Sequence, residues 1–297
     1  PLMLVPDAGP HEGLLSPEDV KEVRSWLEAI AASRIGAALV DRTTQAMLPE
    51  LRRQLLELSE AVELQANSVQ DLRDRVDLAA TQPLSKLTTN AKMGRYGQGA
   101  PTTSWLSFAS SGGVLAPLAT GERPGRWQRR QQGSRDSAIT AVFDGVVNAV
   151  RVGLNQGIIT TDEAIQTAWR EDVVETAEYR RAGHDAINQL EIVNEAIVGW
   201  KSDLFALASS VGENPWLGQA GIAALLGAAA GGVAGAEQTA SSNKLSATVR
   251  SARQALAERL EFAIGRVTTS YRSVLDGIEI GNGRQLRLRA SEYLDRI

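Results

Sequence analysis

The sequence contains no cysteine, few aromatic residues and only two histidines. The lack of cysteine excludes disulfides, zinc–thiolate sites and thiol catalysis. Aromatic residues make up 5% of the chain, and no run of alternating β-branched and polar residues exceeds a few positions, so strands are not expected. Neither His11 nor His184 lies in a metal-binding or triad-like motif. We interpret His184, which stands among Arg180, Arg181 and Asp185, as a solvated surface residue.

Motifs that hold a nucleotide phosphate are also missing. The chain contains neither G-x-x-x-x-G-K-[ST] nor G-x-G-x-x-G. Its acidic residues mostly lie four positions from an arginine or lysine, which is typical of pairing on helix surfaces and gives no sign of a carboxylate dyad. We therefore expect no catalytic residue, cofactor or metal in this chain. A formal net charge of -4 argues against general nucleic-acid binding.

The residues that are present favour helices. Hydrophobic residues make up 43% of the 297 positions, with alanine and leucine recurring throughout. Ser16, Pro17 and Asp19 form a helix start, with serine as N-cap and an acid in the capping-box position. A heptad seam follows, and Pro49 predicts a break or kink just before it. We interpret the seam chiefly as packing within a bundle, with a coiled-coil dimer as the alternative; its members are Leu48, Leu51, Leu55, Leu58, Val62, Val69, Leu72 and Val76.

Glycine and proline interrupt the periodicity between Gln82 and Gly133. These breakers predict an irregular region over 82–133 with only short helices. Its end is basic and contains Trp127. This segment suits an anionic lipid surface, another polyanion or a solvated loop; the arginines expected to contact anionic headgroups are Arg123, Arg126, Arg129 and Arg130.

Helical periodicity returns in the second half of the chain. We expect one helix over 136–154, ended by Asn155-Gln156-Gly157, a long helix from about Thr160 to Val211, and another over 245–278. An uncharged run, 214–236, separates the last two. This order predicts an elongated antiparallel helical bundle over 16–297.

The uncharged run 214–236 is dominated by alanine and glycine. Its length would suffice to span a bilayer, but these residues are weakly apolar, so we expect a bent hairpin or two short helices at one tip of the bundle. Gly227, Gly231 and Gly235 form a tandem G-x-x-x-G face that permits close helix packing, in lipid or in a soluble hairpin. The residues expected to touch or enter lipid are Trp216, Leu217, Ile222, Leu225, Leu226 and Val233.

Several stretches resemble the C-terminal helical region of bacterial, especially actinobacterial, dynamin-like GTPases. Leu14–Ala32 is similar to the first helix after the GTPase domain, and Leu51–Val76 to the long helix that follows. Ile197–Leu207, the alanine- and glycine-rich run and Leu245–Leu260 are similar to the helix, apolar segment and helix of that family's trunk and membrane tip. The GTPase motifs are absent from this sequence.

The resemblance implies a stalk and assembly module that self-associates and binds or remodels membrane. GTP and magnesium would belong to an upstream domain, with residues 1–15 as the linker from it, so the parent protein would be a GTPase. The implied partners are an anionic membrane and a second copy or a paralogue. The implied location is cytoplasmic, peripheral to the inner face of the membrane. The alternatives are an α-helical pore-forming toxin-like protein and a soluble helical scaffold.

Overall fold

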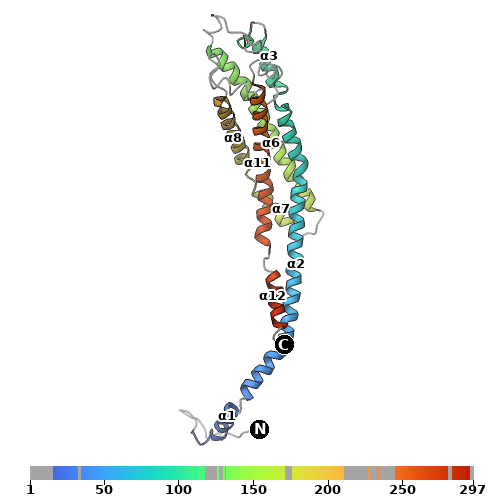
Figure 1. Ribbon diagram of the computed structural model, residues 1–297, viewed down its shortest axis with the longest axis vertical. Coiled ribbons are helices and arrows are strands. Elements are labelled where there is room, and N and C mark those ends of the chain that lie inside the picture. Colours follow the sequence, from blue (N-terminus) through green and yellow to red (C-terminus); the bar gives the residue numbers. More distant parts are fainter. Residues whose placement is uncertain are drawn as a thin grey trace. The chain divides into compact units, whose positions relative to one another are not determined.

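The described part of the chain is entirely helical in its regular structure (Figure 1). The structure is a computed structural model that describes residues 16–32, 35–110, 112–117, 126, 130, 132–170, 176–210, 227, 233, 245–279 and 283–294. These residues contain no strand, which confirms the all-α prediction. The longer elements are α1 (Lys21–Ala32), α2 (Ile35–Lys92), α3 (Ala100–Ala109), α6 (Gln132–Arg170), α7 (Thr176–Asp185), α8 (Gln189–Ser210), α11 (Ser246–Ile278) and α12 (Gly283–Leu294), with a short 3-10 helix, η1 (Arg95–Gly97).

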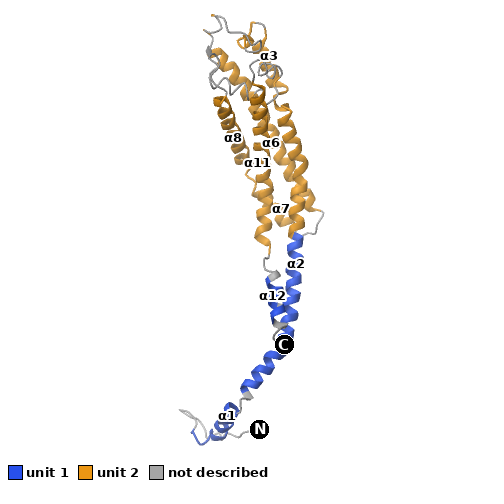
Figure 2. Cartoon of the chain, in the orientation of Figure 1, with its two compact units in different colours: residues 1–68, 280–297 blue, residues 69–279 orange. Residues whose placement is uncertain are grey.

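The chain divides into two compact units, and α2 contributes to both (Figure 2). The first consists of residues 1–68 and 280–297, and the second of residues 69–279. Within the first unit, Arg287 of α12 pairs with Glu63 of α2, with 2.5 Å between Nη2 and Oε2. Val62, next to Glu63, is buried, whereas α1 buries none of its side chains.

The second unit is built from four antiparallel helical segments. Trp169 of α6 donates its indole N–H to the Leu72 carbonyl of α2, while Tyr96, which follows α2, contacts Gly153 earlier in α6. The two helices therefore run in opposite directions. α8 runs antiparallel to α6. Phe143 of α6 packs against Trp200 of α8, whereas Asn155, later in α6, accepts a hydrogen bond from Gln189, the first residue of α8.

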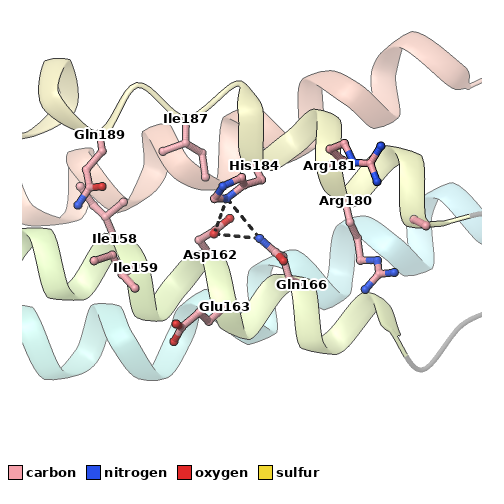
Figure 3. Close-up of a pocket in the computed structure, with 11 residues that line it drawn as sticks. Ile158, Ile159, Asp162, Glu163, Gln166, Arg180, Arg181, His184, Ile187 and Gln189 are labelled. Atoms are coloured by element: carbon pink, nitrogen blue, oxygen red, sulfur yellow. Dashed lines mark hydrogen bonds and ion pairs between the residues drawn. The ribbon is translucent and has the colours of Figure 1, made fainter.

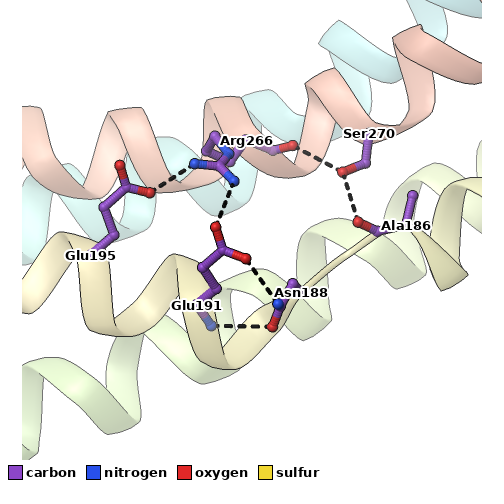
Figure 4. Close-up of polar contacts among 6 residues, drawn as sticks. All are labelled: Ala186, Asn188, Glu191, Glu195, Arg266 and Ser270. Atoms are coloured by element: carbon purple, nitrogen blue, oxygen red, sulfur yellow. Dashed lines mark hydrogen bonds and ion pairs between the residues drawn. The ribbon is translucent and has the colours of Figure 1, made fainter.

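Charged residues align α8 with α11. Arg266 of α11 pairs with Glu195 at 2.7 Å and with Glu191 at 3.5 Å (Figure 4). Arg259, two turns earlier in α11, forms a two-pronged hydrogen bond with Asp203, later in α8. The order of these pairs makes α8 and α11 antiparallel. The same pairs match one sliding register of the two helices, in which Arg259 lies level with Asp203 and Arg266 lies between Glu191 and Glu195.

Apolar side chains at helical spacing form the core of the second unit. α6 buries Ala138, Val142, Val146 and Val150 along one face, and α11 buries Leu256, Leu260, Ile264 and Val267. This spacing is that of a core-facing helix, and burying each such side chain stabilises the fold by about 1.5–3 kcal/mol. Trp105 of α3 and Leu115 are also buried, so part of the glycine-rich region packs into the core.

Several expected interruptions differ from the structure. α2 continues through Pro49, so the helix does not break there, because a proline removes one backbone donor and yet leaves its neighbours free to stay helical. α2 also covers Gln82–Lys92, where Leu87 and Ala91 are buried, so packing overrides the weak periodicity at the start of the predicted 82–133 irregular region. α6 passes through Gly157, whose lack of a side chain leaves room for Leu87 of α2.

The other two corrections concern packing and helix length. The long helix expected from Thr160 to Val211 is instead the end of α6 followed by α7 and α8. Of the predicted α2 seam, Val62, Val69, Leu72 and Val76 are buried as expected, whereas Leu51 and Leu58, earlier in the helix, are 41% and 51% exposed. The seam is therefore packed in its second half, because burial depends on where the neighbouring helices lie. The Asp19 N–H donates to Ser16 Oγ, but these residues form a turn, and α1 begins later than expected, at Lys21.

Candidate functional site

One end of the four-helix unit brings together the two segments expected to meet a membrane. α8 ends and α11 begins at this end, because the two helices are antiparallel. α6 begins there as well, since its Phe143 lies against Trp200 of α8. Arg126 and Arg130 precede α6 and are exposed. The basic segment and the uncharged run 214–236 are therefore joined to the same end of the unit.

Two residues of the uncharged run lie within the described part of the chain. Val233 is fully buried as part of the core. Gly227 lies so close to Phe143 that an added Cβ would stand 2.2 Å from a ring carbon. Gly227 thus allows a close approach, here to a side chain of α6. The remaining predicted tip and headgroup residues lie outside the described residues: Trp216, Leu217, Ile222, Leu225, Leu226, Gly231, Gly235, Arg123 and Arg129.

Among the described helices, one is long and apolar enough to cross a membrane. This helix covers Gly133–Arg170 of α6, and its most apolar window has a mean hydropathy of 1.3 with 39% of that window buried. The core helix of a soluble bundle meets the same criterion, and α6 packs against α2, α8 and α11. The finding is therefore only weak support for membrane insertion of α6.

A second site lies on α6, α7 and α11, and sequence reasoning missed it (Figure 3). A groove of about 710 Å³ opens beside Asp162 of α6 and His184 of α7. The Asp162 carboxylate is almost fully buried and accepts three hydrogen bonds. His184 Nδ1 donates to its Oδ2 at 2.8 Å, Gln166 Nε2 donates to the same oxygen at 3.0 Å, and the Tyr271 hydroxyl of α11 donates to Oδ1 at 2.5 Å.

These bonds fix the chemistry of His184. A carboxylate only accepts hydrogen bonds, so Nδ1 carries the proton that it donates to Asp162. The other ring nitrogen, Nε2, is then directed to the groove, where the side chain is 57% exposed. The interpretation of His184 as a purely solvated residue is thus corrected. Its partner is 22 residues away on another helix, and only the antiparallel packing of α6 and α7 brings the two together.

Tyr271 anchors this cluster from the core side. The ring is fully buried and meets Trp169 edge to face, with 5.2 Å between centroids. Burial raises the pKa of the Tyr271 phenol, and the hydrogen bond to Asp162 and that residue's charge raise it further. The nearby charge of Arg180 acts in the opposite direction. The phenol therefore stays protonated and keeps donating to Asp162 at neutral pH.

The buried phenols predict a loss of stability at alkaline pH. Burial raises the pKa of Tyr96 to about 12, and the pKa of Tyr271 is raised as well, whereas an unfolded tyrosine titrates near 10. The unfolded chain therefore releases these protons first. The stabilisation is complete below pH 10 and declines as the pH rises toward the folded pKa values, by about 1.4 kcal/mol per pH unit for each phenol.

Urea unfolding measured from pH 8 to pH 11.5 tests this expectation. The free energy of unfolding should be level up to about pH 9.5 and then fall. In Tyr271→Phe the stability at pH 8 is lower, but the decline above pH 10 is shallower than in the parent protein. An equal decline in both proteins would show that the Tyr271 phenol does not contribute to this pH dependence.

The groove residues limit what the site can do. Among the described residues that line it there is no serine, threonine, cysteine or lysine to act as a nucleophile beside the Asp162–His184 pair. Within the described residues, no group of three histidine, cysteine, aspartate or glutamate side chains is arranged to hold a metal ion. The arrangement is instead suited to binding, because it combines an oriented imidazole, two arginines and an apolar wall.

Comparison with known proteins identifies no relative of this chain. No protein-family model, no curated protein and no solved structure matches it.

Proposed function

We propose that this chain is a helical stalk and assembly module that binds an anionic membrane through the end where α6 begins and α8 ends. In this proposal the protein is of the dynamin-like kind, and GTP hydrolysis belongs to a domain outside this chain. The module works at the inner face of a cytoplasmic membrane. Its role is mechanical, and the groove residues take no part in catalysis.

The shared end of the basic segment and the uncharged run supports this proposal most directly. Exposed Arg126 and Arg130 stand beside α6 at the end where the chain enters and leaves 214–236. An arginine near an anionic bilayer contributes about 1 kcal/mol to binding. Apolar residues that enter the headgroup region add to this attraction, and tryptophan prefers that region. Basic residues next to an apolar segment are the combination that peripheral membrane binding needs.

Exposed apolar residues in the first unit support self-association. Val40, Met47, Leu51 and Leu58 of α2 are all exposed, and their spacing of seven, four and seven residues places them along one side of the helix. Such a stripe suits a second copy of the chain or a paralogue. Sedimentation velocity over a 100-fold range of protein concentration tests this part of the proposal. A protein that stays monomeric throughout that range would contradict it.

The membrane test is liposome flotation with charge-reversal and apolar-to-acid variants. Arg126→Glu with Arg130→Glu is expected to weaken binding to phosphatidylserine-containing vesicles by about 30-fold or more, from the loss of ~2 kcal/mol. Leu225→Asp with Leu226→Asp should abolish flotation. The matched control is Leu190→Asp with Val198→Asp, since both residues are exposed on α8 away from this end. Flotation that is absent in the parent chain, or equal in all variants, would refute membrane binding.

The buried Val233 favours a second candidate function, that of a soluble helical scaffold. In this candidate, the run 214–236 simply completes the end of the bundle, as Val233 and the close contact of Gly227 with Phe143 suggest. Limited proteolysis with and without vesicles separates the two functions. Cleavage within 214–236 that vesicles do not change indicates a scaffold, whereas protection that requires anionic vesicles indicates a tip. Dye release with discrete conductance would instead indicate a pore-forming protein.

A further inference from the structure

The groove on α6 and α7 has a basic face formed by one side of a single helix. Arg180, Arg181 and His184 line it together with Ala177. The spacing of these four residues, at positions i, i+3, i+4 and i+7, places them on one face of α7. Two guanidiniums and an imidazole therefore border the groove from one helix. This basic character favours an anion as the ligand.

Unsatisfied donors point to the same conclusion. Arg180 Nε is buried and has no hydrogen-bond partner among the described residues. Within the same part of the chain, no acidic side chain forms an ion pair with Arg180 or Arg181, whereas Arg259 and Arg266 on α11 are both paired. A buried donor without a partner costs about 1–3 kcal/mol. A ligand that accepts hydrogen bonds would remove this cost.

The acids in the groove do not neutralise the basic face. The Asp162 carboxylate is occupied by three donors, as described above. The Glu163 side chain points away from His184 in Figure 3, and it also lines a separate groove with Arg75 and Thr160. The apolar part of the lining consists of Ile158, Ile159 and Ile187. The groove thus pairs a basic face with an apolar wall.

We propose that this groove binds a soluble small-molecule phosphate monoester. The phosphate oxygens accept hydrogen bonds from Arg180 and Arg181, the His184 ring lies beside the phosphate, and the organic part of the ligand lies against the isoleucines. Guanidinium groups match phosphate oxygens in geometry and charge. The volume of about 710 Å³ lies within the range of small-ligand pockets. Asp162 acts as a positioning residue, because it holds the His184 ring with Nε2 toward the groove.

The position of the groove favours a soluble ligand over a lipid headgroup. Asp162 is separated from Gln132, the start of α6, by about 45 Å of helix at 1.5 Å per residue. A bilayer that touches the end where α6 begins would lie far from the groove. The groove and the membrane-binding end are therefore independent, so that either proposal can fail without the other.

Histidine NMR tests the proposal on the full chain, which has only two histidines. The titrants are inorganic phosphate and phenyl phosphate at pH 7.0, where the monoester is largely dianionic, with ionic strength held constant by sodium chloride. The His184 ring resonances should shift with saturation, and phenyl phosphate should bind several-fold more tightly because its ring covers the apolar wall. The resonances of His11 serve as the internal reference and should not move.

Two arginine variants complete the experiment. Arg181 is exposed, so Arg181→Gln should fold normally, and it is expected to weaken phenyl phosphate binding about tenfold. Arg250→Gln, at an exposed position near the start of α11, should bind as the parent does. The proposal is overturned if His184 shows no saturable shift, if Arg181→Gln binds as tightly as Arg250→Gln, or if only anionic vesicles move the resonance.

Discussion

Replacing Trp169 with alanine is expected to lower the free energy of unfolding by about 3–5 kcal/mol. The Trp169 side chain is fully buried where α6, α2 and α11 meet. Its indole N–H donates to the Leu72 carbonyl at 3.2 Å, and its ring packs edge to face on Tyr271. Alanine would leave a large cavity and deprive that carbonyl of its indole donor. The midpoint of thermal unfolding should fall by on the order of 10 °C, as measured by circular dichroism.

Trp26→Ala is the matched control for this experiment. Trp26 lies on α1 and is 42% exposed, so its loss should change the stability by less than about 0.5 kcal/mol. Equal effects of the two substitutions would contradict the position of Trp169 in the core. Trp169→Phe should recover part of the loss, because phenylalanine refills most of the volume but cannot donate to Leu72.

Gly183→Ala is expected to destabilise the protein by about 2 kcal/mol, even though alanine is the better helix former. A Cβ at Gly183 of α7 would stand 2.4 Å from Cδ1 and 2.5 Å from Cε1 of Tyr271. The Tyr271 ring has little freedom to move, since Trp169 packs on one side and Asp162 accepts its hydroxyl proton. Either α7 must move away from α11 or the hydrogen bond must lengthen. Chemical denaturation measures the change in stability.

Gly265→Ala provides a control with the opposite sign. Gly265 lies inside α11, and no atom lies within 4 Å of the Cβ that alanine would add. The substitution should stabilise the protein by about 1 kcal/mol through helix propensity alone. If both glycine variants were stabilised, the close contact between α7 and Tyr271 would be wrong. The Gly183 variant should also shift the His184 resonance, because Tyr271 and His184 share the Asp162 carboxylate.

Sequence patterns predicted the helices better than their ends. The all-α class followed from composition, and the face of α11 that contains Leu256, Leu260 and Ile264 is the one that the periodicity indicated. A helix end was predicted wrongly at Asn155-Gln156-Gly157, because local preferences of about 1–3 kcal/mol per residue are outweighed by packing over many turns. Gly157 illustrates the difference. It was expected to end a helix, yet in the structure its lack of a side chain admits Leu87.

The two candidate sites differ in what could be foreseen. The uncharged run 214–236 and its neighbouring arginines were visible in the sequence, because composition changes abruptly there. The groove had one local signal, the spacing of Arg180, Arg181 and His184 along one helical turn. Without Asp162 beside it, however, this spacing is indistinguishable from a solvated helix face.

The sequence by itself determined that this protein is helical, that it has no cysteine chemistry and that one uncharged run interrupts its helices. These properties depend on residue type and on spacing within one helix. Only the tertiary structure decided how much of the α2 seam is buried, which segments share an end of the four-helix unit, and that a buried carboxylate orients His184. The reason is that each of these depends on residues from different helices. Their relative height is set by the summed packing of the bundle, which no local pattern encodes.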